Sequence, residues 1–253
     1  MIQSPTGKNI IIDGGNNRDY DYGENVVVPY LLDRKITKID YLMISHFDSD
    51  HCGGLFAVLR ELKVGMVVIG KQAEEYENCV EFMKLAKEKH VKVIAVQTGD
   101  QLKIDRYLHF DMLWPDSSNL VSDNGINNNS MTAKLVYGNF TMLFTGDIEA
   151  IAEEQIVKMY ENRNILDCDI LKVAHHGSKS SSIEQIVNLV TPKISVIGVG
   201  EDNKYGHPNK DVIGRMEGIG ARVYRTDQNG EISIEVNKKG KVRIRKFIEG
   251  KEK

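Results

Sequence analysis

Four side chains that commonly bind metal ions lie within six residues of this chain: His46, Asp48, Asp50 and His51. They occupy a polar segment between an apolar run and a Gly-Gly pair. In an extended segment alternate side chains point the same way, so His46, Asp48 and Asp50 would converge. Open α/β sheets bind ligands at the carboxyl ends of their strands, which makes this segment a candidate metal site. The alternative is a solvated acidic loop whose aspartates cap the following helix.

Two further polar segments follow predicted strands. Thr145-Gly146-Asp147 ends the apolar run at 141–144, and the AHHGS segment at 174–178 ends the run at 169–173. By itself, a Gly-Asp pair after a strand is more typical of a turn than of a metal ligand. Adjacent side chains of an extended chain point to opposite faces. We therefore expect only one of His175 and His176 to bind metal at a given site.

The histidines are unevenly distributed along the chain. Five of the seven follow predicted strands or stand beside glycine: His46, His51, His175, His176 and His207. The other two, His90 and His109, are interpreted as structural or surface residues.

The elements that must position these side chains alternate between strands and helices. Apolar runs predict strands at 9–13, 39–45, 65–69, 92–96, 101–104, 107–114, 131–137, 140–144, 169–174, 193–198, 221–226, 231–236 and 241–247. Helical spacing of apolar residues predicts helices at 54–62, 73–89, 150–160, 183–190 and 209–219. Two β-rich halves, each flanked by helices, predict an α/β fold of layered sheets between helices. No long Pro/Gly/Ser linker interrupts the chain, so we expect a single domain over 1–253.

The charge of the chain is unevenly distributed. Its 33 basic and 36 acidic side chains give a net charge of −3, which excludes a uniformly basic nucleic-acid-binding surface. Residues 236–253 nevertheless carry eight Lys or Arg and two Glu. One interpretation of this basic end is a solvated edge strand protected by lysine. The other is a patch that faces anions such as a phosphate backbone.

Membrane and disulfide signals are weak in this sequence. No apolar run approaches the roughly 18 residues of a membrane-spanning helix, and no apolar leader follows Met1. We therefore expect no membrane insertion by this chain. Cys52, Cys79 and Cys168 form no CxxC pair, so neither a disulfide framework nor a Cys-rich zinc site is indicated.

The three polar segments, taken in order, resemble the metallo-β-lactamase superfamily of binuclear metallohydrolases. More narrowly, the chain resembles the metallo-β-lactamase-like domain of ComEC-type DNA-internalisation proteins. The supporting segments are IIIDGGNN (10–17), GENVVVPYLL (23–32), ITKIDYLMISHFDSDHCGG (36–54), NNNS (127–130), LFTGD (143–147), LKVAHHGS (171–178), YGHPN (205–209) and ARVYRTDQNGEISI (221–234). This resemblance implies an αββα four-layer fold. Such domains begin with a strand and a Gly-Gln-Gly-Asp turn, and this chain starts just past that point, so we expect the first strand to be lacking.

The resemblance also implies a set of site residues that holds two divalent metal ions. His46 and Asp48 would bind the first ion, and Asp50, His51 and His175 would bind the second, with Asp147 bridging both. Asp50 and Asp147 are thereby expected to be catalytic. His176 and His207 would contact the substrate phosphate or donate a proton. Asp13 would orient a ligand histidine.

Two departures from the family pattern bear on the metal. Asp48 stands where the superfamily usually has the second histidine of HxHxDH, and Asn127–Ser130 stands where a separate histidine is usual. The first site therefore gains oxygen ligands at the expense of imidazole. Oxygen-rich sites favour harder ions, so Mn²⁺ is favoured, with Zn²⁺ or Mg²⁺ as alternatives.

The implied function is a metal-dependent phosphodiesterase, most specifically a nuclease that degrades single-stranded DNA, independently of sequence, during competence-related uptake. One alternative is a small-molecule phosphodiesterase similar to phosphorylcholine esterases. The other is a non-catalytic DNA-binding adaptor. The resemblance further implies a soluble domain at the outer face of the cytoplasmic membrane, partnered by a membrane channel segment of a parent protein. Outside such a parent, a cytoplasmic location is expected.

Overall fold

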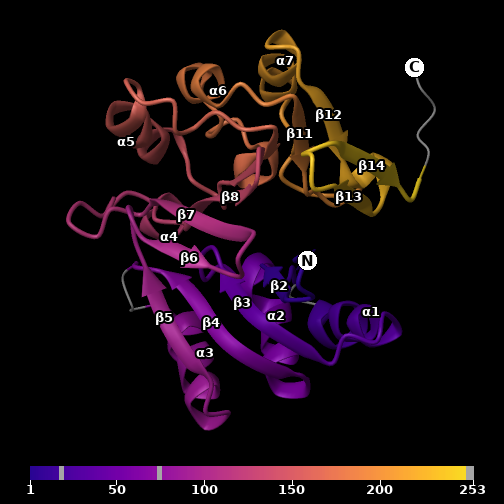
Figure 1. Ribbon diagram of the computed structural model, residues 1–253. Helices are drawn as coiled ribbons and strands as arrows, with labels where there is room; N and C mark the ends of the chain where they lie inside the picture. Colours follow the sequence, from indigo (N-terminus) through magenta and orange to yellow (C-terminus); the bar gives the residue numbers. More distant parts are fainter. Residues whose placement is uncertain (17–19, 73–75, 249–253) are drawn as a thin grey trace. The chain divides into compact units, whose positions relative to one another are not determined.

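The computed structural model describes residues 1–16, 20–72 and 76–248, and it divides into two compact units (Figure 1). The first unit comprises residues 1–108 and 112–131, and the second comprises 109–111 and 132–253. The last five residues of the basic end, 249–253, lie outside the described residues. The expectation of one domain stays a prediction.

The first unit is built on a five-stranded sheet. Its order is β1 (Ile2–Gln3), β2 (Asn9–Ile12), β3 (Lys38–Ile44), β4 (Lys63–Gly70) and β5 (Lys92–Val96). Strands β2 to β5 pair in parallel, whereas the short β1 pairs antiparallel with β2. Because β2 and β3 are parallel neighbours, their carboxyl ends lie at the same edge of the sheet.

Helices pack on this first sheet. A π-helical turn, Gly23–Val27, runs into α1 (Val28–Asp33), and α2 (Ser49–Glu61), α3 (Glu77–Glu88) and the short α4 (Gly125–Asn128) follow. The hydrophobic core combines side chains of the helices and the sheet: Leu31, Leu42, Ile44, Leu55, Leu59, Val67, Phe82 and Ala86 are all part of it. Burial of this apolar surface holds the helices against the strands.

The start of α2 corrects a prediction from the sequence. The apolar spacing predicts a helix over 54–62, but α2 begins at Ser49, and the carbonyl of Asp48 accepts a hydrogen bond from the backbone N–H of Cys52 (2.9 Å). Cys52 and Leu55 are fully buried at helical spacing, so the apolar face of α2 already begins at the residue before the Gly-Gly pair. The polar side chains of that first turn conceal the helix in the sequence.

Two other helices differ from the prediction. No helix is predicted over 23–33, where the chain forms the π-helical turn and α1. Pro29 lies in the first turn of α1, where a proline costs no helical hydrogen bond. The helix predicted over 73–89 is α3, and the residues 73–75 of that prediction lie outside the described residues.

The second unit contains a hairpin followed by parallel strands. β8 (Thr132–Tyr137) and β9 (Phe140–Phe144) pair antiparallel across a Gly-Asn turn, as their sequence predicts. β10 (Ile170–Lys172), β11 (Ile194–Ile197) and β12 (Arg222–Arg225) then add in parallel beyond β9. The carboxyl ends of β9, β10 and β11 consequently lie at one edge of the second unit's strands.

A helix follows each of the first three parallel strands. α5 (Ala150–Tyr160) follows β9, α6 (Glu184–Val190) follows β10, and α7 (Lys210–Gly218) follows β11. These positions agree with the predicted helices to within a few residues. A tight 3₁₀ turn, Ala174–Gly177, stands between β10 and α6, and a single helical turn, α8 (Thr226–Asn229), follows β12.

Two further pairs of consecutive strands complete the described part of the fold. β6 (Gln101–Lys103) and β7 (Leu108–Trp114) follow β5 in the chain, and the boundary between the units falls within β7. At the other end, β13 (Ile232–Val236) and β14 (Val242–Lys246) form a separate antiparallel hairpin. This hairpin carries most of the basic end of the chain.

The described part of the chain bears on the membrane and disulfide predictions made from the sequence. None of its helices is both long and apolar enough to cross a membrane. Cys52, Cys79 and Cys168 are buried free thiols. Burial raises the pKa of both Cys52 and Cys168 to about 12, so these thiols remain protonated at neutral pH.

A buried carboxylate joins two helices of the second unit. Glu153, in the first turn of α5, is 1% exposed, and its two oxygens accept the backbone N–H groups of Ser182 (2.7 Å) and Ile183 (2.8 Å). These N–H groups immediately precede α6, so the carboxylate satisfies donors at a helix start that would otherwise be buried without partners. Burial is the main cause that raises the pKa of Glu153 to about 7.

The raised pKa predicts a stability that depends on pH. Because the folded carboxyl holds its proton more tightly than the unfolded one, its stabilising contribution is complete below about pH 4.5 and is lost as pH rises through about 7. The difference is on the order of 3 kcal/mol. Glu153→Gln should therefore flatten the pH profile of the unfolding free energy, measured by urea denaturation between these values. The exposed neighbour variant Glu154→Gln should keep the wild-type profile, and parallel profiles for Glu153→Gln and wild type would refute the assignment.

Candidate metal centre

The candidate site of the first unit is organised by one carboxylate at the end of β2. Asp13 Oδ1 accepts the backbone N–H of Ser45, and Asp13 Oδ2 accepts the Ser45 hydroxyl, both at 2.8 Å. Asp13 Oδ2 also lies 2.9 Å from Nδ1 of His51. Asp13 adopts a left-handed backbone conformation (φ +57°), which aspartate tolerates better than most residues. The carboxylate therefore joins the ends of β2 and β3 to the first turn of α2.

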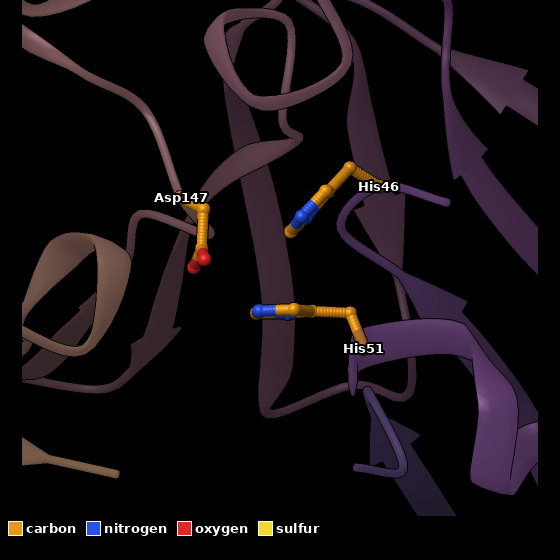
Figure 2. Close-up of side chains that lie close together, drawn as sticks. All are labelled: His46, His51 and Asp147. Carbon is orange, nitrogen blue, oxygen red and sulfur yellow. The ribbon is translucent and has the colours of Figure 1, made fainter. Parts of the chain in front are cut away.

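These hydrogen bonds determine where the imidazoles of His46 and His51 carry their protons. A carboxylate without a proton only accepts, so His51 must donate from Nδ1 to Asp13. The Ser45 hydroxyl gives its single hydrogen to Asp13, so it can only accept from Nδ1 of His46, at 3.0 Å. In both rings the lone pair consequently lies on Nε2. Figure 2 shows the two buried rings side by side, with their centroids 4.1 Å apart.

The surroundings of Asp13 keep its carboxyl ionised. Burial alone would raise the pKa of Asp13, but the neighbouring His51, its hydrogen bond and the Ser45 N–H hold the pKa below its ordinary value. Asp13 is thus an ionised acceptor at neutral pH. The carbonyl of Ser45 is fixed as well, because it accepts from the Gln72 amide (3.0 Å) and from the Met131 N–H (2.7 Å).

Glycines allow the turn after β2 to touch the first turn of α2. The N–H of Gly14 donates to the carbonyl of His51, and the N–H of Gly54 donates to the carbonyl of Gly15, both at 2.7 Å. A Cβ on Gly54 would stand 2.4 Å from the carbonyl oxygen of Gly14, which no side chain tolerates. The Gly-Gly pairs of the sequence are therefore explained by close backbone packing that holds Asp13 beside His51.

The aspartates of the segment after β3 are more exposed than its histidines. Asp48 Oδ2 lies 3.7 Å from Nε2 of His46, as alternation along an extended segment predicts. Asp50 departs from that alternation, because it lies in the first turn of α2 rather than in an extended segment. The ligand atoms of Asp50 and His51 are nevertheless within 4.8 Å of each other. Asp48 makes no side-chain capping hydrogen bond to α2, which weakens the capping alternative.

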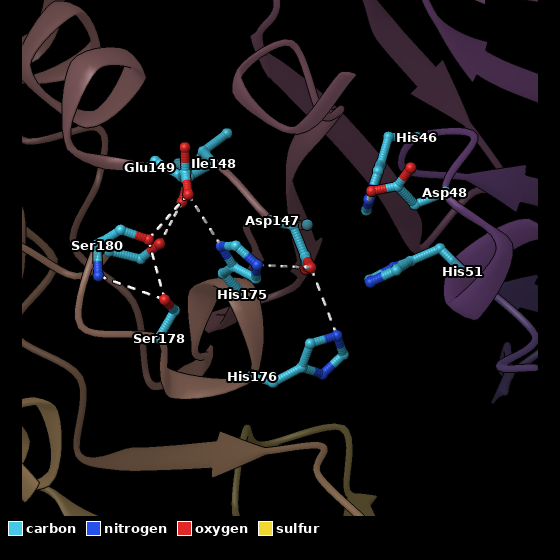
Figure 3. A network of polar contacts seen from close by, with 12 residues as sticks. His46, Asp48, His51, Asp147, Ile148, Glu149, His175, His176, Ser178 and Ser180 are labelled. Carbon is cyan, nitrogen blue, oxygen red and sulfur yellow. Dashed lines mark hydrogen bonds and ion pairs between the residues drawn. The ribbon is translucent and has the colours of Figure 1, made fainter. Parts of the chain in front are cut away.

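The candidate site of the second unit lies at the carboxyl ends of β9 and β10. Asp147 Oδ2 is 3.4 Å from Nε2 of His176 and 3.9 Å from Nε2 of His175 (Figure 3). Nδ1 of His176 lies 2.6 Å from the carbonyl oxygen of Gly198, which only accepts, so this ring also carries its proton on Nδ1. The ring is thereby oriented so that its Nε2 faces Asp147.

The two adjacent histidines do not point to opposite faces. That expectation requires extended backbone, whereas His175 (φ +48°) and His176 (φ +53°) are both in the left-handed region of a tight turn. Both rings consequently face the same carboxylate, Asp147. The geometry of this unit does not favour His175 over His176 as the ligand, so the assignment of His175 stays a prediction.

A further carboxylate, not singled out from the sequence, lies on the other side of His175. Glu149 Oε1 is 3.4 Å from Nδ1 of His175 and accepts the hydroxyl of Ser180 at 2.8 Å (Figure 3). The Ser180 carbonyl in turn accepts the N–H of Ala150 at the start of α5. Glu149 is only two residues from Asp147, but nothing in the sequence pattern indicates that the loop after the histidines returns to it.

His207, the remaining predicted site residue, also belongs to this group. Its ring centroid is 5.7 Å from that of His175, in an edge-on arrangement. Burial, and then the nearby His175 and His176, lower the pKa of His207 below its ordinary value. The second unit thus gathers Asp147, His175, His176 and His207.

Residues 127–130, which stand where the superfamily usually has a separate histidine, have a structural role. Asn128 donates to the carbonyl of Asp123 (2.8 Å), and its own carbonyl accepts the indole N–H of Trp114 (2.7 Å). Asn129 donates to the carbonyl of Val121 and accepts the Val121 N–H. These amides stabilise a buried turn.

The family follows from the comparison of sequences. A model of the metallo-β-lactamase superfamily matches residues 1–201. This chain belongs to the metallo-β-lactamase superfamily. The resemblance inferred from the ordered ligand segments is thereby confirmed.

Curated relatives include a ComE operon protein and a competence protein. ComE operon protein 3 of Bacillus subtilis is 33% identical over 213 residues, which cover 84% of this chain and 26% of that protein. Competence protein ComA of Neisseria gonorrhoeae is 31% identical over 225 residues, which cover 87% of this chain and 29% of that protein. The chain therefore spans less than a third of the length of these relatives.

Solved structures confirm the α/β fold. The diiron β-hydroxylase CmlA from Streptomyces venezuelae superposes with a TM-score of 0.51 at 14% identity, over 75% of this chain and 44% of that one. At this level of identity the likeness concerns the fold alone.

The donors of this metallo-β-lactamase domain fit divalent metal ions. Imidazole nitrogen and carboxylate oxygen are the ligands that Mn²⁺ and Zn²⁺ take in proteins. Within the first unit, ligand atoms of His46 and His51 are within 4.8 Å of each other, and both rings have the Nε2 lone pair that a metal requires. The histidine and aspartate groups of the domain are therefore able to bind metal.

Asp13→Asn is expected to weaken Mn²⁺ binding by about 10- to 100-fold. The asparagine oxygen can still accept the Ser45 N–H, but its NH₂ group would face Nδ1 of His51. His51 would then accept at Nδ1 and carry its proton on Nε2, where a metal cannot bind. Isothermal titration with MnCl₂ measures the change.

The matched control is Asp40→Asn, in the same sheet. Asp40 accepts the N–H of Asn9 and is ion-paired with Lys38, so its loss affects stability but not the imidazoles. Equal Mn²⁺ affinities for Asp13→Asn and wild type would contradict the role of Asp13.

Proposed function

We propose that this domain is a metal-dependent phosphodiesterase that degrades DNA during competence-related uptake. The observation that carries the proposal is the set of imidazoles whose Nδ1 atoms are held by acceptors, at the carboxyl ends of β3 and β10. Such an arrangement prepares Nε2 for metal and is expected of a metal-dependent hydrolase of this superfamily. DNA as the substrate is supported by the relative whose name refers to competence.

The proposed ligand set, which the family resemblance implies, would hold two divalent ions. His46 and Asp48 would bind one ion, Asp50, His51 and His175 the other, and Asp147 both. The amides at 127–130 are engaged in their own turn, which supports a first site with few imidazole ligands and hence a preference for Mn²⁺. When bound, the ions supply positive charge that polarises a phosphodiester and makes water a better nucleophile.

The chain's own residues orient the substrate around these ions. His176 is fixed through Nδ1, so its ring is held in place to contact a phosphate oxygen or the leaving group. His207, beside His175, is proposed to make a second such contact. Asp13 holds His51 and Glu149 faces His175, and neither carboxylate touches the substrate in this scheme.

The hairpin of β13 and β14 is proposed to bind the DNA backbone without reading its sequence. Lys238, Lys239, Lys241 and Arg243 are exposed on it, while Arg245 is ion-paired with Glu235 (3.1 Å). Basic side chains on a solvent-facing hairpin contact phosphates and release counterions. The acidic net charge of the chain does not oppose this, because the attraction is confined to the hairpin and the metal centre.

The decisive assay is Mn²⁺-dependent hydrolysis of single- and double-stranded DNA. Asp147→Ala should lower the rate of hydrolysis by at least about 100-fold, because the loss of a metal ligand should lower activity more than the loss of a residue that only holds a ligand in place. Asp211→Ala, which removes an exposed aspartate of α7, should retain wild-type activity. Equal activity in Asp147→Ala and wild type would refute the proposal.

Hydrolysis of a small phosphodiester without any cleavage of DNA would instead assign a small-molecule phosphodiesterase, and tight DNA binding without hydrolysis would assign an adaptor.

The hairpin is tested by the salt dependence of DNA binding. If Lys241 and Arg243 each contact one phosphate, replacing both by Gln should reduce the slope of log K against log salt by about 1.4 for a single strand. Filter binding or fluorescence anisotropy at several NaCl concentrations measures this slope. Replacing Lys84 and Lys87, two exposed lysines of α3, removes the same charge and should leave the slope unchanged. Equal slopes for the hairpin variant and wild type would exclude the hairpin as a DNA-binding element.

A further inference from the structure

An exposed aromatic ring stands beside the histidines of the second unit. The side chain of Tyr205 is 83% exposed, although it follows β11 at the edge where the candidate metal ligands lie. Its ring stacks on that of His207, with centroids 5.8 Å apart and planes inclined by 20°. One face of the Tyr205 ring is therefore supported by an imidazole, and the rest of the ring is open to solvent.

The stacked pair leads directly to the candidate ligands. His207 lies 5.7 Å from His175, ring to ring, and Nε2 of His175 lies 3.9 Å from Asp147. Tyr205 is thus two ring-to-ring contacts from a proposed ligand imidazole. A group that rests on Tyr205 would be next to whatever occupies the Asp147 site.

The loop that presents the pair is held in one conformation. The side chain of Asn203 accepts the N–H of His207 (2.9 Å) and donates to its carbonyl (2.7 Å). The N–H of Asn209 donates to the carbonyl of Gly177 (2.8 Å), and a Cβ on Gly177 would stand 2.6 Å from Cβ of Pro208. The loop is therefore packed against the turn that carries His175 and His176. A surface fixed before binding loses little conformational entropy when a ligand rests on it.

We propose that Tyr205 and His207 form a stacking platform for a nucleobase adjacent to the cleaved phosphate, and hence that the substrate is a single-stranded nucleic acid. The proposal rests on the phosphodiesterase function above and specifies the substrate. Bases within a duplex are stacked on each other and cannot lie on a side chain, whereas the bases of a single strand can. Every base has a π-face, so such a platform accepts any sequence.

The test is the binding of a fluorescent oligothymidylate by Tyr205→Ala and Tyr205→Phe, measured by anisotropy with EDTA present so that hydrolysis cannot occur. Tyr205→Ala should raise Kd by roughly 5- to 150-fold, the range for loss of one base–aromatic stack. Tyr205→Phe keeps the ring and should bind as the wild type does. Tyr107→Ala, which removes an exposed tyrosine of the first unit, should also bind as the wild type does. Duplex DNA should bind equally to Tyr205→Ala and wild type.

The possible outcomes separate a failure of the stacking platform from a failure of the proposed nuclease function. Unchanged oligothymidylate binding by Tyr205→Ala, in a protein whose wild type cleaves DNA, overturns the platform and leaves the nuclease intact. If Tyr205→Ala raises Kd equally for single-stranded and duplex DNA, base stacking is overturned. If Tyr205→Phe raises Kd as much as Tyr205→Ala does, base stacking is overturned in favour of a contact by the phenol hydroxyl. A wild-type protein that cleaves a small phosphodiester with Mn²⁺ but neither binds nor cleaves DNA overturns the proposed function itself.

Discussion

The candidate metal centre depends on the direction in which a few imidazole rings carry their protons. In the first unit one carboxylate, Asp13, sets this direction for both His46 and His51, through the single hydrogen of the Ser45 hydroxyl. A neutral imidazole can bind a metal only through the nitrogen without a proton. The parallel register of β2 and β3, the left-handed backbone at Asp13 and the contact between the Gly-Gly turns all bring this carboxylate to the rings.

In the second unit the ring held in this way is His176, whose Nδ1 lies against the backbone carbonyl of Gly198, and Glu149 faces Nδ1 of His175 at 3.4 Å. Left-handed backbone at both histidines turns the rings toward Asp147, although they are neighbours in sequence. The serine-rich loop that follows is fastened to α5 through Ser180 and Glu153, so the turn has little freedom to relax. In the second unit, then, these contacts hold His176 and the turn that carries His175.

Much of this fold could be predicted from the sequence, because the local patterns of apolar residues agree with the strands and helices that form. Apolar runs identified β2 to β5 and β8 to β12, and the segments that end β3, β9 and β10 contain the candidate ligands. What could not be predicted depends on the folded backbone. The early start of α2 is hidden by polar residues in its first turn, and the common orientation of His175 and His176 requires φ values that no side-chain pattern encodes. The approach of Glu149 and Ser180 to His175 depends on the return of a loop, which only the packed structure reveals.

The central claim is that these oriented imidazoles and carboxylates bind divalent metal, and the metal content of the protein tests it most directly. After dialysis against Mn²⁺ and removal of free ion, mass spectrometry of the metal in wild-type protein should give at least about one tightly held ion per chain, which a His46→Ala, His51→Ala, Asp147→Ala variant should lose. A wild-type protein that retains no more Mn²⁺ or Zn²⁺ than this triple variant would contradict the account.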